Sequence, residues 1–79
     1  MPTINIYSTP TCVYCRMAKE FFDQHKILYT DHNVAQDASY RDEMIQRSGQ
    51  MGVPVIDVDG QLIVGFDKAR LMELLGIKN

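Results

Sequence analysis

The sequence predicts an α/β fold whose strands and helices follow one another in the order βαβαββα. Stretches rich in β-forming residues alternate with stretches of helical periodicity, and Asp59-Gly60 separates the last two β-rich stretches. The first half is a βαβ unit, which implies two parallel strands joined by a right-handed crossover. The second half adds an antiparallel hairpin. We therefore expect a four-stranded mixed sheet with helices on both faces, in a single domain that covers residues 1–79.

The first βαβ unit is predicted from the pattern of its apolar residues. The stretch "TINIYS" over residues 3–8 alternates and is rich in β-formers, so it predicts a strand. A helix should follow over residues 12–25, with Thr11 as its N-cap. Residues 27–34 indicate the second strand. The helix residues at the spacing of a core-facing stripe are Ala18, Phe21 and Phe22.

Two further helices are predicted from their end signals. Residues 35–49 should form the second helix, because Asp37 or Ser39 can cap its start and Gly49 can end it. A short last helix should follow Asp67, which is again a good N-cap. Its apolar residues expected to face inward are Leu71, Leu74 and Leu75.

The hairpin is the clearest local signal apart from the cysteines. Asp59-Gly60 supplies the positive φ angles that a two-residue type I′ turn requires. The β-rich runs on either side should therefore pair in antiparallel fashion, as strands over Val55–Val58 and Gln61–Val64.

The composition is that of an ordinary globular domain, with 46% hydrophobic and 23% charged residues. The net charge of −2 shows no basic excess, so nucleic acid is not an expected partner. The longest apolar run is far shorter than the roughly 18 residues of a membrane span. The N-terminus lacks the pattern of a signal peptide. We therefore expect a cytoplasmic protein that does not bind membranes. We also expect a monomer.

The two cysteines of the chain, Cys12 and Cys15, stand two residues apart at the start of the first predicted helix. The positive end of a helix stabilises a thiolate, and Arg16 and Lys19 add positive charge nearby. Cys12 is therefore expected to be nucleophilic at neutral pH. Cys15 lies nearly one turn further on, where it can attack a mixed disulfide formed at Cys12. This spacing beside a βαβ pattern is typical of a redox-active pair.

Three other interpretations of the cysteines are less favoured. A structural zinc site needs four ligands, and His25 and His32 lie far from Cys12 along the chain. A structural disulfide across two residues closes too small a loop to constrain the unfolded chain much. The pair could also be two buried apolar cysteines that happen to lie close together.

The whole chain resembles a glutaredoxin, a small member of the thioredoxin-fold superfamily. The resemblance rests on "CVYC" at Cys12–Cys15, Val53-Pro54 before the third strand, the Asp59-Gly60 hairpin, and "GFD" at Gly65–Asp67. Short glutaredoxin-like proteins of anaerobic bacteria and archaea are also similar.

The resemblance implies thiol–disulfide exchange, with Cys12 as the attacking thiol and Cys15 as the resolving thiol. It also implies a cis Val53-Pro54 peptide bond that faces the cysteines, so that an extended substrate can pair with the Val53 backbone. The residues that it implies for substrate binding are Thr11, Tyr14, Val53, Pro54, Gly65, Phe66 and Asp67.

Several positions depart from the glutathione-dependent pattern. Val13 stands where many such proteins have proline, although Tyr14 keeps their tyrosine. Thr9 stands where they often have a cation that can pair with a glutathione carboxylate. Gly52 replaces the threonine of their Thr–Val–Pro motif, and Val64 replaces the first glycine of a Gly–Gly pair.

Valine after the first cysteine and the Gly65-Phe66 pair instead resemble redoxins that donate electrons to ribonucleotide reductase and are reduced by thioredoxin reductase. We therefore expect a carrier without a bound cofactor, whose partners are disulfide-containing proteins. Its electrons should come from glutathione or, as we prefer, from a protein reductase of the thioredoxin reductase type. Arg47 is a candidate replacement for the missing cation. The alternative is an iron–sulfur module, whose cluster Cys12 and glutathione would bridge between two subunits.

Overall fold

The computed structural model describes residues 3–77 of the chain. The elements within this range follow the predicted order: β1 (Ile4–Ser8), α1 (Val13–Gln24), β2 (Thr30–Asn33), α2 (Ala38–Ser48), β3 (Val55–Val58), β4 (Gln61–Val64) and α3 (Lys68–Leu75). None of the helices in this described part is long and apolar enough to cross a membrane.

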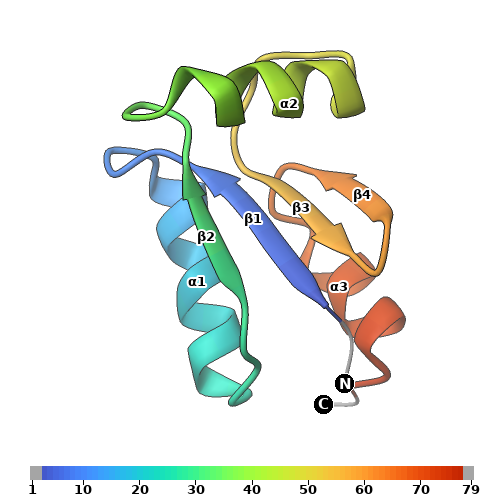
Figure 1. The fold of residues 1–79 in the computed structure, drawn as a ribbon. Coiled ribbons are helices and arrows are strands. Elements are labelled where there is room, and N and C mark those ends of the chain that lie inside the picture. The colour runs from blue at the N-terminus through green and yellow to red at the C-terminus, as the bar shows by residue number, and fades with distance from the viewer. Residues whose placement is uncertain (1–2, 78–79) are drawn as a thin grey trace.

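The strands form one mixed sheet in the order β2-β1-β3-β4 (Figure 1). Strand β1 runs parallel to β2 and antiparallel to β3, and β3 pairs in antiparallel fashion with β4. The helices α1 and α3 pack against one face of this sheet, and α2 packs against the other. The predicted fold class, a mixed four-stranded sheet with helices on both faces, is therefore confirmed.

The larger apolar cluster lies between the sheet and the pair α1 and α3. Its buried members are Ile4, Ile6, Ala18, Phe21, Phe22, Ile56, Val58, Ile63 and Leu71. Leu74 and Leu75, which were predicted to face inward, are half-buried and pack against this cluster. Both phenylalanines of α1 thus serve as core residues, as their helical spacing predicts.

The other face of the sheet is held to α2 by fewer apolar and more polar contacts. Met44 is the buried residue of α2. The Tyr7 hydroxyl donates to Glu43 (2.9 Å) and accepts from Arg47 (3.2 Å). The Arg47 guanidinium also donates to the buried carboxylate of Asp57 on β3 (3.1 Å). A hydrogen-bonded network therefore ties α2 to β1 and β3.

Two of the three helix starts match their predicted caps. The Asp37 carboxylate accepts the Ser39 N–H at the start of α2, and the Asp67 carboxylate accepts the Arg70 N–H at the start of α3. Gly49 ends α2 in the left-handed conformation, with φ of 75°, which glycine adopts without steric cost.

The cap of α1 corrects the prediction that Thr11 caps this helix. Cys12 is the N-cap, because its backbone is still extended (φ −85°, ψ 118°) and its sulfur accepts the Cys15 N–H. Thr11 lies one residue earlier and is exposed. A thiol thus occupies the place of the usual hydroxyl or carboxylate.

Strand β2 is shorter than the predicted range of 27–34. The chain leaves α1 through Lys26, whose φ is 56°, and the Ile27 N–H returns to the Phe22 carbonyl (2.8 Å). Pairing with β1 starts only at Thr30, which stands opposite Asn5. In this register residues 27 and 28 precede the first residue of β1, so β1 offers them no partner.

The hairpin forms as predicted, with strands over the expected residues. Asp59 and Gly60 both have positive φ, 52° and 92°. The Asp57 carboxylate accepts the Gly60 N–H (2.6 Å) and so adds a side-chain bond across the turn.

Replacing Gly60 with alanine should lower the free energy of unfolding by about 1 kcal/mol, because a Cβ is disfavoured at this positive φ. Urea unfolding followed by circular dichroism measures the change. The neighbouring Gln61→Ala is the control, because Gln61 is exposed and should shift the value by less than about 0.5 kcal/mol. Equal effects of the two substitutions would contradict the role given to Gly60.

Candidate active site

The pairing of the strands brings three separate segments to one end of the sheet. Tyr7 stands opposite Val55 in the β1–β3 pair, and Val55 stands opposite Val64 in the β3–β4 pair. The loop after β1, the segment before β3 and the segment after β4 must therefore lie side by side. These segments carry Cys12, Val53-Pro54 and Gly65–Asp67 respectively.

Cys12 lies at the junction of the first two segments. Its sulfur accepts the N–H of Cys15 (3.3 Å), and its thiol points at the carbonyl oxygen of Val53 (3.8 Å). The side chain is partly exposed, so solvent and a substrate sulfur can reach it. Both cysteines are free thiols in this structure.

Cys15 has a very different setting from Cys12. Its side chain is only 1% exposed, and burial raises the pKa of this thiol to about 12. The hydrogen bond with Cys12 raises the pKa further, whereas the nearby charge of Lys19 opposes these effects. Cys15 is therefore a neutral thiol at physiological pH.

The charge of Lys19 is partly neutralised, which the sequence did not indicate. Its ammonium group forms an ion pair with Asp31 on β2 (2.7 Å). The other oxygen of Asp31 accepts the hydroxyl of Ser8 (2.6 Å), which is buried at the end of β1. The positive charge expected near Cys12 is thus left mainly to Arg16 and the helix end.

The Val53-Pro54 peptide bond is cis, as the resemblance implied. The Pro54 carbonyl accepts the Gly65 N–H (2.7 Å), which joins the second and third segments. The residue before this pair, Gly52, is bonded at both its N–H and its carbonyl by the side-chain amide of Gln50. Nothing in the sequence pattern indicated this contact.

The remaining predicted substrate residues lie at the start of α1 and on the segment that leads into α3. Tyr14 is 61% exposed on the first turn of α1, beside the exposed Thr11. Phe66 is half-buried and its ring lies 6.0 Å from that of Phe21. The Asp67 carboxylate caps α3, so it is already engaged with a backbone N–H.

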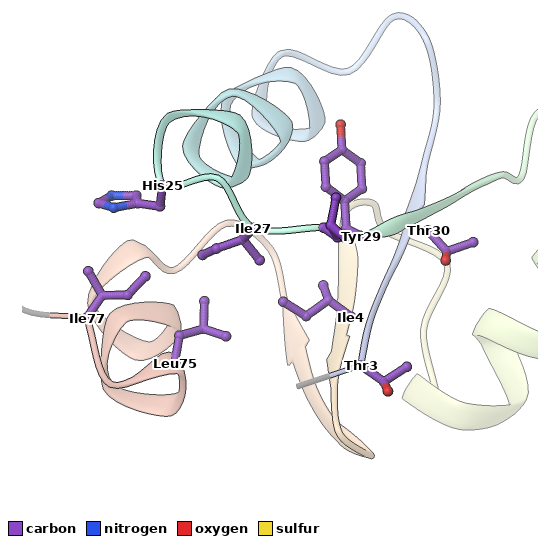
Figure 2. Close-up of a pocket in the computed structure, with 9 residues that line it drawn as sticks. Thr3, Ile4, His25, Ile27, Tyr29, Thr30, Leu75 and Ile77 are labelled. Carbon is purple, nitrogen blue, oxygen red and sulfur yellow. The ribbon is translucent and has the colours of Figure 1, made fainter. Parts of the chain in front are cut away.

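A hollow of about 520 Å³ lies at the opposite end of the sheet. Ile4, Ile27, Leu75 and Ile77 point into it from β1, the chain after α1, and the end of α3 (Figure 2). It contains no residue of the candidate site. Within residues 3–77, no three His, Cys, Asp or Glu side chains are grouped so as to hold a metal ion.

The fold and the cysteine pair together define a protein of the thioredoxin-like class. A crystal structure of a thioredoxin-like protein superimposes with a TM-score of 0.91 and 29% identity, covering 99% of this chain and 100% of the other. The glutaredoxin family model matches residues 4–63.

Curated relatives agree with this match. A glutaredoxin-like 8.6 kDa protein of the Clostridium pasteurianum rubredoxin operon is 50% identical, over 91% of this chain and 96% of the relative. Glutaredoxin 3 of Escherichia coli is 34% identical, over 96% and 92%. The glutaredoxin-like protein NrdH of Lactococcus lactis is 27% identical, over 90% and 97%. The chain belongs to the glutaredoxin family of thiol oxidoreductases.

The buried thiol of Cys15 should make the reduced protein less stable at alkaline pH. The unfolded thiol ionises near its ordinary pKa of 9.0, whereas the folded thiol keeps its proton until about 12. The unfolded state then binds fewer protons, so the free energy of unfolding falls as pH rises through this window.

Urea unfolding of the reduced protein from about pH 8 to about pH 11 measures this loss. Cys15→Ala is the control, because it removes the titrating group while keeping Cys12 and every tyrosine. The stability difference between the two proteins should shrink as pH rises. A constant difference across the range would contradict the assignment.

Proposed function

We propose that this protein reduces disulfide bonds, with Cys12 as the attacking thiol and Cys15 as the resolving thiol. The observation that supports this proposal is the unequal setting of the two cysteines. Cys12 is partly exposed at the start of α1, and Cys15 is buried behind it with a pKa raised to about 12 by burial. The first can meet a substrate, and the second can meet only Cys12.

In the first step, the Cys12 thiolate attacks one sulfur of the substrate disulfide. A Cys12–substrate disulfide forms, the substrate S–S bond breaks, and the departing sulfur takes up a proton. The Cys15 N–H and the positive end of α1 both stabilise negative charge on the attacking sulfur.

In the second step, Cys15 gives up its proton and attacks the sulfur of Cys12. The Cys12–Cys15 disulfide forms, and the second substrate sulfur leaves as a thiol after taking up a proton. Two electrons have then passed from the protein to the substrate. An external reductant must supply two electrons and two protons to restore both thiols.

The substrate would be held by the backbone beside Pro54. The Val53 carbonyl lies 3.8 Å from the Cys12 sulfur, and within residues 3–77 the Val53 N–H donates no hydrogen bond. An extended peptide can therefore pair with Val53 as a short strand and present its sulfur to Cys12. Thr11, Tyr14 and Gly65–Asp67 would border this groove.

Substituting each cysteine separately tests the two roles. Cys12→Ser should abolish reduction of a peptide disulfide, because the attacking sulfur is gone. Cys15→Ser should stop after the first step and accumulate a mixed disulfide at Cys12, which mass spectrometry of the unreduced protein detects.

Alkylation gives an independent check. Iodoacetamide near neutral pH should modify Cys12 before Cys15, since only Cys12 is accessible. Mixed disulfides on Cys15, or faster alkylation of Cys15, would reverse the assignment.

We further propose that a protein reductase serves this chain better than glutathione does. A glutathione carboxylate needs a cation beside the groove, and Thr9 cannot supply one. Arg47 does not offer a ready replacement, because its guanidinium is bonded to Asp57 and to the Tyr7 hydroxyl. The lost charge-assisted contact corresponds to about 1.5–3 kcal/mol.

Exposed apolar side chains on the segments that carry Cys12 and Val53 favour a protein partner. Val13, Tyr14 and Met51 are 63%, 61% and 68% exposed. Such a surface offers area that a large partner can bury and a charged tripeptide cannot. The resemblance to redoxins that serve ribonucleotide reductase agrees with this choice.

Turnover with thioredoxin reductase and NADPH should therefore exceed turnover with glutathione and glutathione reductase. Thr9→Lys should raise the glutathione-dependent rate about tenfold by restoring the cation. Thr30→Lys adds the same charge on β2 and should leave that rate unchanged. Fast turnover of the native protein with glutathione, and none with the protein reductase, would overturn the proposal.

A further inference from the structure

The segment that faces Cys12 is held by an unusual side-chain contact. The Gln50 amide oxygen accepts the Gly52 N–H, and the Gln50 amide nitrogen donates to the Gly52 carbonyl (3.0 Å). An amide that bonds both polar groups of one residue reproduces the pairing that a neighbouring antiparallel strand would make. The Gln50 side chain thus takes up the hydrogen-bonding groups of Gly52 that a neighbouring strand would otherwise pair with.

The segment is anchored on both sides of this contact. Before it, the Ser48 hydroxyl lies within hydrogen-bond distance of the Met44 carbonyl (2.6 Å) and the Gln50 carbonyl (3.0 Å). After it, the Pro54 carbonyl accepts the Gly65 N–H (2.7 Å). The chain between α2 and β3 is therefore held at its start by the Ser48 hydroxyl, near its middle by Gln50, and at its end by a backbone hydrogen bond.

The absence of a side chain at Gly52 has a specific cause. Its φ lies outside the left-handed region, so the backbone conformation itself does not require glycine. A Cβ at this position would instead lie 2.6 Å from the Gln50 amide oxygen. Glycine is needed at position 52 so that the Gln50 amide can reach the backbone. The contact therefore depends on both residues.

We propose that Gln50 is a positioning residue, which holds the Gly52 backbone so that the N–H and the carbonyl of Val53 face a peptide bound at Cys12. This inference rests on the proposed reduction of disulfides. It also limits the substrate class. Because Gln50 already occupies both polar groups of Gly52, a substrate strand pairs with the chain at Val53 and not beyond it towards Gly52.

Two disulfide substrates can distinguish an effect on substrate positioning from an effect on the reactivity of Cys12. An oxidised peptide with one disulfide can pair with Val53, whereas 2-hydroxyethyl disulfide has no peptide groups and cannot. Fully reduced protein is mixed with each compound, and the loss of protein thiols over time gives a second-order rate constant without any external reductant.

Gln50→Ala should slow the reaction with the peptide about threefold to tenfold, the effect of losing a positioned hydrogen bond. Its reaction with 2-hydroxyethyl disulfide and its alkylation by iodoacetamide should stay unchanged. Gln50→Met, which keeps the length of the side chain without its amide, should behave like Gln50→Ala. Gln46→Ala, an exposed glutamine on α2, is the matched control and should have no effect.

Gly52→Ala provides the second half of the test. The Cβ would displace the end of a flexible side chain, so this variant should fold and show the same selective loss. The double variant should be no slower than either single variant, because both remove one contact. In the native protein the Gly52 amide should exchange with deuterium more slowly than in Gln50→Ala.

The outcomes distinguish a failure of the positioning role from a failure of the proposed function. Unchanged peptide rates in Gln50→Ala, or additive losses in the double variant, would overturn the positioning role while leaving the proposed function intact. Equal losses with both disulfides would also overturn it. If the native protein reduced neither compound, the proposed function itself would fail, and this inference would fail with it.

Discussion

The antiparallel pairing of β1 with β3 is the constraint on which the candidate site depends. The cysteines lie just after β1, and the cis proline lies just before β3. Only an antiparallel register that sets Tyr7 opposite Val55 brings these two segments to the same end of the sheet. A parallel arrangement of the two strands would place Pro54 at the end where β1 begins, far from Cys12. The strand pairing of the sheet, more than the conformation of either loop, thus determines where the site forms.

Most of the fold could be predicted from local signals that agree with one another. Asp59-Gly60 fixes the hairpin, and the acidic residues Asp37 and Asp67 mark two helix starts, because each signal acts within a few residues of its effect. The ends of β2 could not be read in this way. They depend on where β1 begins, which is a property of a neighbouring strand.

In the candidate site, too, some features could be predicted from local sequence and others could not. The cysteine spacing indicates the chemistry, but it does not show that Cys15 is buried whereas Cys12 is partly exposed, because burial depends on the tertiary fold. The ion pair between Lys19 and Asp31 joins a helix to a strand, so no local pattern indicates it. The contact of Gln50 with Gly52 is local in sequence, yet neither residue type has a strong preference for it.

The two faces of the sheet differ in how firmly they hold their helices. On one side, α1 contributes three residues, Ala18 and two phenylalanines, to the larger apolar cluster. On the other side, α2 buries Met44 and relies on the network of Arg47 with Asp57 and the Tyr7 hydroxyl. Polar contacts of this kind contribute less net free energy than buried apolar area, and salt screens their charged part. Local opening of the native protein should therefore begin at α2. The segment that carries Val53 directly follows the C-terminal end of this helix. Under the proposed function, the more rigid half of the molecule would supply the reacting sulfurs, and the half that opens more readily would supply the surface that receives the substrate.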